Sequence, residues 1–131
     1  MEKIILDTNF LMIPIQFRVD IFSELNRICN FNYELFVFDQ TINELKSIIV
    51  KDSKHKRAAQ FALKLIKLKN IEIIKSENKD VDTLILENLS KDMTVATQDI
   101  NLRKELLKKG ASVILLRQKK YLELVERKLY K

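Results

Sequence analysis

The sequence alternates between short runs rich in β-branched residues and longer stretches with the spacing of amphipathic helices. Five runs have the length and composition of buried strands: Lys3–Leu6, Leu35–Phe38, Ile71–Ile74, Thr94–Thr97 and Ser112–Leu116. Apolar residues recur at helical spacing in the other stretches, which are Val19–Ile28, Gln40–Ile49, His55–Leu68, Val81–Leu89, Ile100–Lys108 and Lys119–Leu129. Strands that alternate with helices favour a parallel sheet covered on both faces. The pattern therefore predicts an α/β fold, a three-layer α/β/α sandwich with a central parallel sheet of about five strands.

The chain length and composition fit one globular domain. With 131 residues, 47% of them hydrophobic, the chain is long enough to bury a core. No linker, repeat or low-complexity tail separates the elements, so we expect residues 1–131 to form a single domain. The single glycine, Gly110, is expected to close the helix before it. Glycine-rich phosphate loops of the Rossmann or P-loop kind are excluded, because such loops need several glycines.

The composition also bears on the cellular setting. The one cysteine, Cys29, can form no disulfide within the chain, which fits a buried thiol in a reducing cytoplasm. No signal region or long uncharged apolar run is present, so we expect a cytoplasmic protein without a membrane partner. The formal charge of +6 fits a polyanionic partner, but lysine-rich composition also accompanies growth at high temperature. Charge alone therefore identifies no partner.

Acidic side chains follow four of the five predicted strands. This position matters because ligands of open α/β sheets bind in the crevice beyond the carboxyl ends of the strands. The polar residues there are Asp7, Thr8 and Asn9 after the first strand, Asp39 and Glu44 after the second, Asp80 and Asp82 after the third, and Thr97, Asp99 and Asn101 after the fourth. The fifth strand is followed by the cations Arg117, Lys119 and Lys120.

Several of these acids have an ordinary structural explanation. Asp39, Asp80 and Asp99 stand where a helix needs an N-cap residue, and aspartate is among the best caps. Asp82 lies beside the apolar stripe of its helix and is not explained as a solvent-facing cap. Asp7 directly follows a buried strand, where an unpaired carboxylate is costly. Asp7 and Asp82 therefore indicate a functional site.

Asp7, Glu44, Asp82 and Asp99 are expected to converge at one edge of the sheet. Four carboxylates in a cleft repel one another, and either raised pKa values or a bound hard cation relieves the repulsion. Oxygen ligands without a histidine or cysteine cluster suit Mg²⁺ or Mn²⁺. We expect the lone His55, which lies in a charged run, to be exposed. The sequence therefore predicts a divalent cation site that can activate water toward a phosphodiester.

Neighbouring polar residues have expected supporting roles. Thr8, Asn9 and Thr97 are placed to orient the acids or the water. The cations Arg117, Lys119 and Lys120 are placed either to contact a phosphate backbone or to form the solvated start of the last helix. The residues themselves leave these two interpretations open.

Four blocks, ILDTNFLMIP, INELKSI, DVDTLILENL and VATQDINLRKELLKKGASVILLRQKK, resemble in this order the acidic motifs of the PIN-domain ribonucleases. The likeness is closest to small stand-alone archaeal members and covers nearly the whole chain. It implies an Mg²⁺- or Mn²⁺-dependent endoribonuclease that leaves 5′-phosphate and 3′-hydroxyl ends on RNA. It also implies a homodimer, and either ribosomal RNA processing or a toxin role with an antitoxin partner. Carried over by position, the site is Asp7, Glu44, Asp82 and Asp99, with Thr97 beside them.

The chain departs from the family pattern at two positions. Asn101 stands where many relatives carry a further acid, and Thr83 stands where many carry a second aspartate. Both changes lower the negative charge of the site. The four central acids are intact, so the resemblance predicts an active enzyme.

Two other classes compete with the nuclease interpretation. A catalytically silent RNA-binding or assembly module would use the basic surface and leave RNA intact when Mg²⁺ is added. A receiver-type phosphoacceptor domain would also be α/β, and Thr97 fits its pattern. However, Arg117 stands where such a domain needs lysine, and the first strand lacks its paired acid.

Overall fold

The computed structural model describes residues 1–126 and shows one six-stranded sheet. The strand order is β3-β2-β1-β4-β5-β6. The strands are β1 (Glu2–Leu6), β2 (Tyr33–Phe38), β3 (Glu72–Ile74), β4 (Met93–Ala96), β5 (Ser112–Arg117) and β6 (Tyr121–Val125). The first five are parallel to one another, and β6 runs antiparallel to β5. The α/β sandwich is confirmed, with six strands in place of about five.

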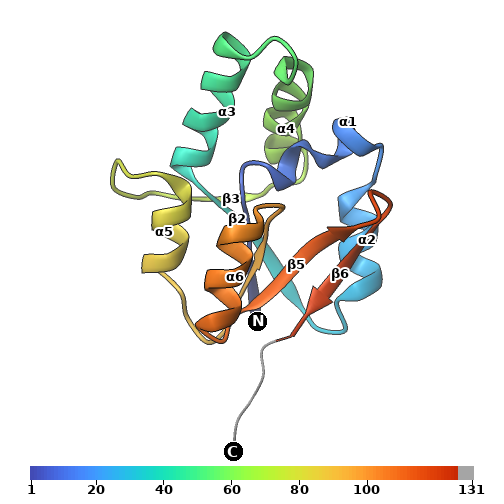
Figure 1. Cartoon of the computed structure of the whole chain (residues 1–131), viewed down its shortest axis with the longest axis vertical. Helices are drawn as coiled ribbons and strands as arrows, with labels where there is room; N and C mark the ends of the chain where they lie inside the picture. Colours follow the sequence, from blue (N-terminus) through green and yellow to red (C-terminus); the bar gives the residue numbers. More distant parts are fainter. Residues whose placement is uncertain (127–131) are drawn as a thin grey trace, which may run out of the picture.

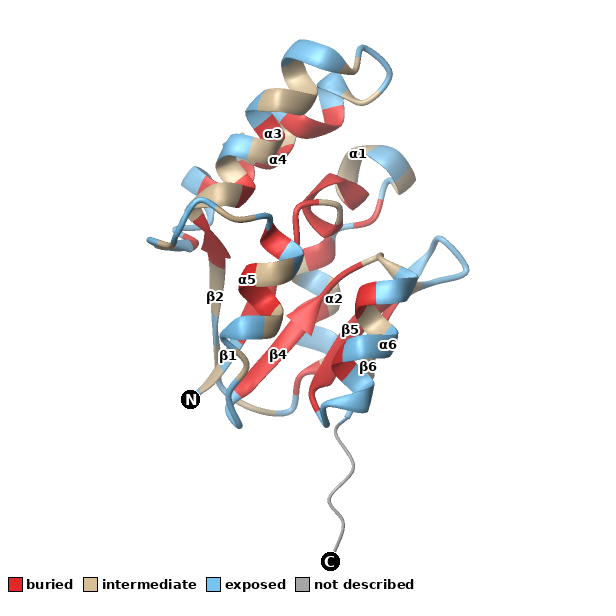
Figure 2. Cartoon of the chain, turned by 60° about the vertical axis from the view of Figure 1, so that its left-hand side comes forward, coloured by how far each residue is buried: buried red, intermediate tan, exposed pale blue. Residues whose placement is uncertain are grey.

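Helices cover both faces of this sheet (Figure 1). They are α1 (Ile13–Phe17), which follows a 3₁₀ turn at Phe10–Met12, α2 (Ile21–Ile28), α3 (Asp39–Lys51), α4 (Lys56–Leu68), α5 (Val81–Glu87) and α6 (Ile100–Lys108). One core cluster joins the sheet to α5 and α6, and the other joins it to the remaining helices. Figure 2 shows the buried central strands between exposed outer helix faces. The central β1 residues Ile4, Ile5 and Leu6 have no exposed surface, as a strand covered on both faces requires.

The prediction of a helix over Lys119–Leu129 is wrong for the residues that the structure describes. Gln118 and Lys119 have positive φ angles of 52° and 57°, and they form the turn that leads into β6. Leu122 on β6 is buried in the core, whereas Tyr121 beside it is exposed. The apolar positions of this segment thus follow the two-residue period of a strand. Residues 127–129 of the predicted helix lie outside the described residues.

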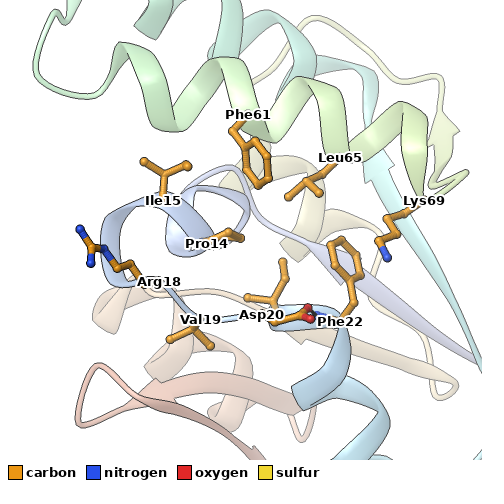
Figure 3. A pocket seen from close by; sticks show the side chains of 10 residues that line it. Pro14, Ile15, Arg18, Val19, Asp20, Phe22, Phe61, Leu65 and Lys69 are labelled. Carbon is orange, nitrogen blue, oxygen red and sulfur yellow. Dashed lines mark hydrogen bonds between the residues drawn. The ribbon is translucent and has the colours of Figure 1, made fainter.

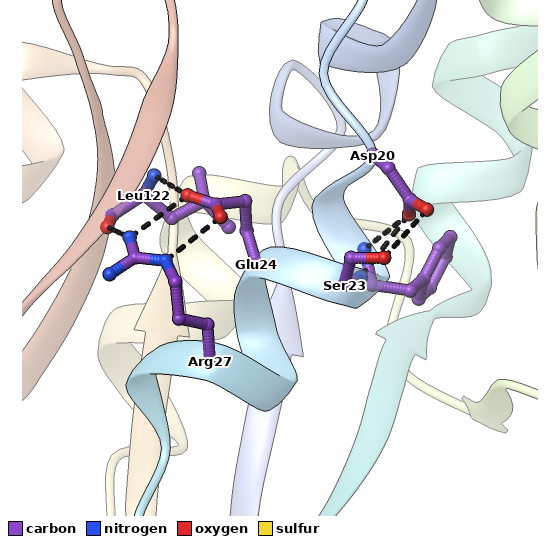
Figure 4. Close-up of polar contacts among 6 residues, drawn as sticks. Asp20, Ser23, Glu24, Arg27 and Leu122 are labelled. Carbon is purple, nitrogen blue, oxygen red and sulfur yellow. Dashed lines mark hydrogen bonds and ion pairs between the residues drawn. The ribbon is translucent and has the colours of Figure 1, made fainter.

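Helix α2 covers part of the free edge of β6 (Figure 4). The Leu122 N–H donates to Glu24 Oε1 at 2.9 Å, and Arg27 donates to the Leu122 carbonyl at 3.0 Å. Glu24 and Arg27 also bind each other at 2.9 Å. The two side chains therefore occupy the backbone groups that an edge strand otherwise leaves open to pairing.

The helix ends show which acids are caps. Asp80 and Asp99 cap α5 and α6 through backbone N–H groups, as predicted. Asp39 does not cap, because α3 begins one residue earlier, and its carboxylate accepts hydrogen bonds from the N–H and hydroxyl of Ser76. Asp20 caps α2, which the sequence pattern did not single out. Gly110 follows the C-cap residue of α6 with a φ of 79°, so its position as a helix stop is confirmed.

Two smaller features complete the fold. Cys29 is buried, and burial raises the pKa of its thiol. Within the described part of the chain, no helix has the length and apolar character needed to cross a bilayer.

Candidate functional site

The strand order places the candidate acids at one crevice. The chain moves outward from β1 to β2 and β3 on one side, and to β4, β5 and β6 on the other. The carboxyl ends of β1 and β4 therefore flank the switch point where ligands of such sheets bind. Asp7 follows β1 and Thr97 follows β4, while α3 and α5 bring Glu44 and Asp82 to the same end.

Asp7 lies at the centre of this site. Its side chain is 3% exposed and accepts hydrogen bonds from the Thr8 N–H at 2.8 Å and the Thr97 hydroxyl at 2.7 Å. Burial raises the pKa of Asp7 to about 6. The hydrogen bond from Thr97 opposes that rise in pKa, and the charges of Asp82 and Glu44 add to it. Asp7 is therefore a buried acid that lacks a cationic partner among its pKa determinants.

Thr97 links the two central strand ends. Its hydroxyl donates to Asp7 Oδ2 and accepts from the Asp99 N–H at 3.0 Å. The Asp99 carboxylate then accepts from the N–H groups of Asn101 and Leu102 at the start of α6. This chain of bonds fixes the position of Asp99 relative to Asp7.

Glu44 is held from two directions. Its Oε1 accepts a short hydrogen bond of 2.5 Å from the Thr8 hydroxyl, and its Oε2 accepts from the Val81 N–H at 3.4 Å. Val81 is the first residue of α5, so Glu44 bridges the loop after β1 and the helix that carries Asp82. This contact holds Glu44 of α3 close enough to Asp82 of α5 for the two charges to interact.

Asp82 is surrounded by other carboxylates. The residue is exposed overall, yet loss of hydration at its carboxyl group is the largest cause of its raised pKa. The charges of Asp99, Asp80 and Glu44 raise that pKa further, as does a hydrogen bond with Asp99. The Asp82 carboxylate is therefore repelled by the charges of both Glu44 and Asp99.

Two other predicted site residues, Asn9 and Asn101, have no side-chain hydrogen bond to the four acids among the contacts of residues 1–126. The Asn9 side chain accepts from the Gln98 N–H at 3.2 Å, and the Gln98 side chain donates to the Asn9 carbonyl at 2.9 Å. These bonds join the loops after β1 and β4, and Gln98 was missed because its partner is distant in sequence. Asn101 is exposed, and its backbone N–H donates a hydrogen bond to the Asp99 carboxylate.

The cations after β5 divide into two kinds. Arg117 is engaged with Glu123, at 3.1 Å across the β5–β6 hairpin. Lys119 and Lys120 are exposed in the turn of that hairpin. All three side chains are exposed, and Arg117 differs from the two lysines by its surface ion pair.

The donor set fits a hard divalent cation in its chemistry. The four acids offer only oxygen atoms, and their mutual repulsion is the state that a cation relieves. Among residues 1–126, however, no group of three or more histidine, cysteine, aspartate or glutamate side chains is placed to hold a metal ion as it stands. Metal binding therefore requires side-chain rotation at the exposed or half-buried members, Asp82, Asp99 and Glu44.

An apolar pocket lies on a different part of the molecule (Figure 3). It has a volume of about 380 Å³ and lies between α4 and the segment that joins α1 to α2. Pro14, Phe22 and Phe61 contribute to its walls, and the ammonium of Lys69 stands 4.9 Å from the Phe22 ring centre. None of the four acids lines it, so the pocket is separate from the candidate site.

Comparisons with known proteins agree with the resemblance of the motifs. A family model described as a PIN like domain matches residues 4–119. Ribonuclease VapC4 of Methanocaldococcus jannaschii is 31% identical over 128 residues, which cover 95% of this chain and 97% of that protein.

Two solved structures share the fold. The PIN domain endonuclease Utp24 has a TM-score of 0.74 at 20% identity, with 98% of this chain and 96% of that chain covered. VapBC2 from Rickettsia felis, bound to a DNA fragment from its promoter, has a TM-score of 0.54 at 18% identity, with 88% and 99% covered. The family match and the 31% identity show that the chain belongs to the PIN-domain ribonuclease family.

Proposed function

We propose that this protein is an Mg²⁺- or Mn²⁺-dependent endoribonuclease whose acids are Asp7, Glu44, Asp82 and Asp99. The observation that carries the proposal is the raised pKa of both Asp7 and Asp82, each caused in part by the other acids of the set. Carboxylates that are buried or partly desolvated and that face one another are typical of catalytic sites. We propose that the single domain extends over residues 1–131. All four acids lie within residues 1–126, which the structure describes.

Each side chain has a distinct part in the proposed reaction. Asp7, fixed by Thr8 and Thr97, provides an oriented oxygen at the floor of the crevice. Glu44 comes from α3, whereas Asp82 on α5 and Asp99 at the start of α6 lie close enough to hydrogen-bond to each other. A divalent cation bound there supplies Lewis-acid polarisation of the phosphodiester and of the attacking water.

The polar neighbours support this arrangement without replacing an acid. Thr8 positions Glu44, and Asn9 holds the loop that carries Thr97 through Gln98. Asn101 and Thr83 lower the charge of the site relative to the family pattern, and the four acids remain. Arg117, Lys119 and Lys120 are proposed to contact the RNA backbone at the carboxyl end of β5.

The cellular role divides into two candidates. The identity with a protein named Ribonuclease VapC4 supports a toxin-type role in the cytoplasm with an antitoxin partner, and ribosomal RNA processing is the alternative. A homodimer is also proposed for either role. Expression in a bacterial host separates the two: a toxin stops growth, and the product of the adjacent gene restores it. Accumulation of ribosomal RNA precursors in a deletion strain indicates the processing role.

The activity itself is tested with a pair of neighbouring variants. Asp82→Asn is expected to abolish cleavage of a panel of structured RNAs in Mg²⁺ or Mn²⁺. Asp80→Asn is the matched control, because it removes the same charge two residues away and asparagine also caps helices. Asp80→Asn is expected to retain most of the activity, and EDTA is expected to stop the parent enzyme.

Three outcomes contradict the proposal. Equal cleavage by the parent and by Asp82→Asn means that the acids are not the site. RNA that is bound but stays intact with both metals supports the silent binding module, and a phosphoaspartate formed with acetyl phosphate supports the receiver-type domain.

A further inference from the structure

The positive charge of the chain is concentrated in one structural element. Residues 45–69, here named the α3–α4 arm, contain eight lysine and arginine residues and one acid, Asp52. The whole chain has 24 lysine and arginine residues and 18 acids. The remainder therefore has 16 basic and 17 acidic residues and is close to neutral. The cations of the arm are Lys46, Lys51, Lys54, Lys56, Arg57, Lys64, Lys67 and Lys69. The net charge of the protein is therefore the charge of this arm.

These cations are free to bind a partner. All eight are exposed. In the portion of the chain that the structure describes, none of them forms a salt bridge, and the arm's only acid is held by His55 at 2.7 Å. Lys69 also lies over the Phe22 ring. Unpaired cations held on one rigid element repel one another, and this arrangement persists most readily where a polyanion covers it.

The arm is connected directly to the candidate site. Figures 1 and 2 show α3 and α4 standing beyond the carboxyl ends of the strands, with the exposed end of the hairpin farthest from the sheet. Glu44 and Lys51 are seven residues apart on α3, which puts them on the same face and about 10 Å apart along the helix. That distance corresponds to about three nucleotides at a rise of 3.4 Å each. Lys54, Lys56 and Arg57 continue the positive surface around the turn.

We infer that the tip of the α3–α4 arm, formed by Lys51, Lys54, Lys56 and Arg57, binds the phosphate backbone of the RNA on one side of the bond that is cleaved. The inference rests on the proposed function, because it assumes that RNA is the substrate at Glu44. Contacts to phosphates position a strand without reading its bases. The arm thus sets how far the RNA must extend from the cleaved bond.

The test compares two quadruple variants that remove equal charge. One changes Lys51, Lys54, Lys56 and Arg57 to alanine, and the control changes Lys91, Lys104, Lys108 and Lys109 to alanine. The control cations are also exposed; Lys91 lies before β4 and Lys108 and Lys109 lie at the end of α6, all at the opposite end of the sheet, and Lys104 lies midway along α6. Both sets are made in the Asp82→Asn background so that RNA stays intact, and circular dichroism confirms that each variant is folded.

Binding of a labelled single-stranded RNA is followed by fluorescence anisotropy over a salt series. The tip variant is expected to bind at least tenfold more weakly, and the slope of log affinity against log salt should fall by about 2 to 3, at about 0.7 per lost contact. The control should stay within about threefold of its parent, since it has lost only long-range attraction. Equal effects in the two variants overturn the inference. A Lys51→Gln, Lys54→Gln double variant removes two of the tip charges and keeps polar side chains. Its RNA affinity is compared with that of the parent in the same way.

Two further measurements separate the alternatives. With the Asp82 site restored, the tip variant should lose cleavage of long RNAs, and an RNA that ends within about three nucleotides of the cleaved bond on the arm side should be cut equally by both enzymes. Tight binding of the arm to vesicles of anionic lipid, with RNA binding unchanged in the tip variant, overturns the inference in favour of a membrane surface. RNA binding that depends on the tip without any cleavage by the parent rejects the proposed function and the cleaved-bond part of the inference, and it leaves only backbone binding by the tip.

Discussion

The Thr97 hydroxyl donates a hydrogen bond of 2.7 Å to Asp7 Oδ2 across 90 residues of sequence. The Thr97 hydroxyl oxygen also accepts a hydrogen bond from the Asp99 N–H. One small side chain therefore joins a buried acid after β1 to the cap of α6. Neutral hydrogen-bond donors can orient an acid but cannot cancel its charge. Asp7 therefore remains electrostatically unfavourable when ionised, which gives rise to measurable effects on stability.

Asp7→Asn is expected to stabilise the metal-free protein at neutral pH. The rise in the pKa of Asp7 from 3.8 to about 6 corresponds to about 3 kcal/mol of destabilisation. Because the folded-state pKa is above the unfolded value, the penalty is absent below pH 3.8, grows between 3.8 and about 6, and is complete above 6. In urea unfolding with EDTA, the variant should have the higher free energy of unfolding at pH 7.5. The difference should vanish below pH 3.8. A constant difference across this pH range contradicts the assignment.

Removal of the Thr97 hydroxyl should raise the pKa of Asp7 further. Thr97→Val removes the hydrogen bond that lowers this pKa and leaves the Asp99 N–H without its acceptor, at a cost of about 1 to 3 kcal/mol. The acidic limb of the cleavage-rate profile should move to higher pH, since ionised Asp7 is the active form. Thr97→Ser keeps the hydroxyl and should retain the parent profile. If the cleavage rate of Thr97→Val depends on pH as that of the parent does, Thr97 does not position Asp7.

Asp99 serves as both a helix cap and a site acid, and two substitutions separate these roles. Asp99→Asn keeps a good capping side chain, so its free energy of unfolding should stay within about 0.5 kcal/mol of the parent or exceed it. Asp99→Ala loses the cap and should be less stable by about 1 kcal/mol. Both should lose RNA cleavage. If the asparagine variant remains active, capping is the whole role of this residue.

Divalent metal should stabilise the folded protein by binding between the acids. At a metal concentration about 100 times the dissociation constant, linkage predicts about 2.7 kcal/mol. Thermal unfolding with Mg²⁺ or Mn²⁺, compared with EDTA, measures this increment. Glu44→Gln should reduce it, whereas Asp92→Asn, at the opposite end of β4, should leave it unchanged. An equal increment in both variants places the bound metal elsewhere.

The local pattern of the sequence was sufficient for most elements. The helix predicted over Ile100–Lys108 has the same limits in the structure, and Gly110 follows its cap as expected. Such features depend on the spacing of apolar residues and on capping, both of which act within a few residues. The strand-end acids also follow from local pattern, because parallel strands all end at the same side of a sheet.

The errors arose where local pattern allows two structures. The segment YLELV satisfies helical spacing and strand alternation alike, and only pairing with β5 selects the strand. Asp39 has the chemistry of a cap, but the extension of α3 by one residue places its carboxylate on Ser76.

The sequence by itself predicted the family and the layered fold, which are confirmed, and it proposed the four acids, because each depends on residue types at set intervals along the chain. Tertiary structure alone decided that Thr8 holds Glu44, that Gln98 holds Asn9, and that the cations of one hairpin stand beyond the acidic crevice. These relations join segments distant in sequence. Their geometry exists only after the sheet has brought the segments together, so no local pattern encodes it.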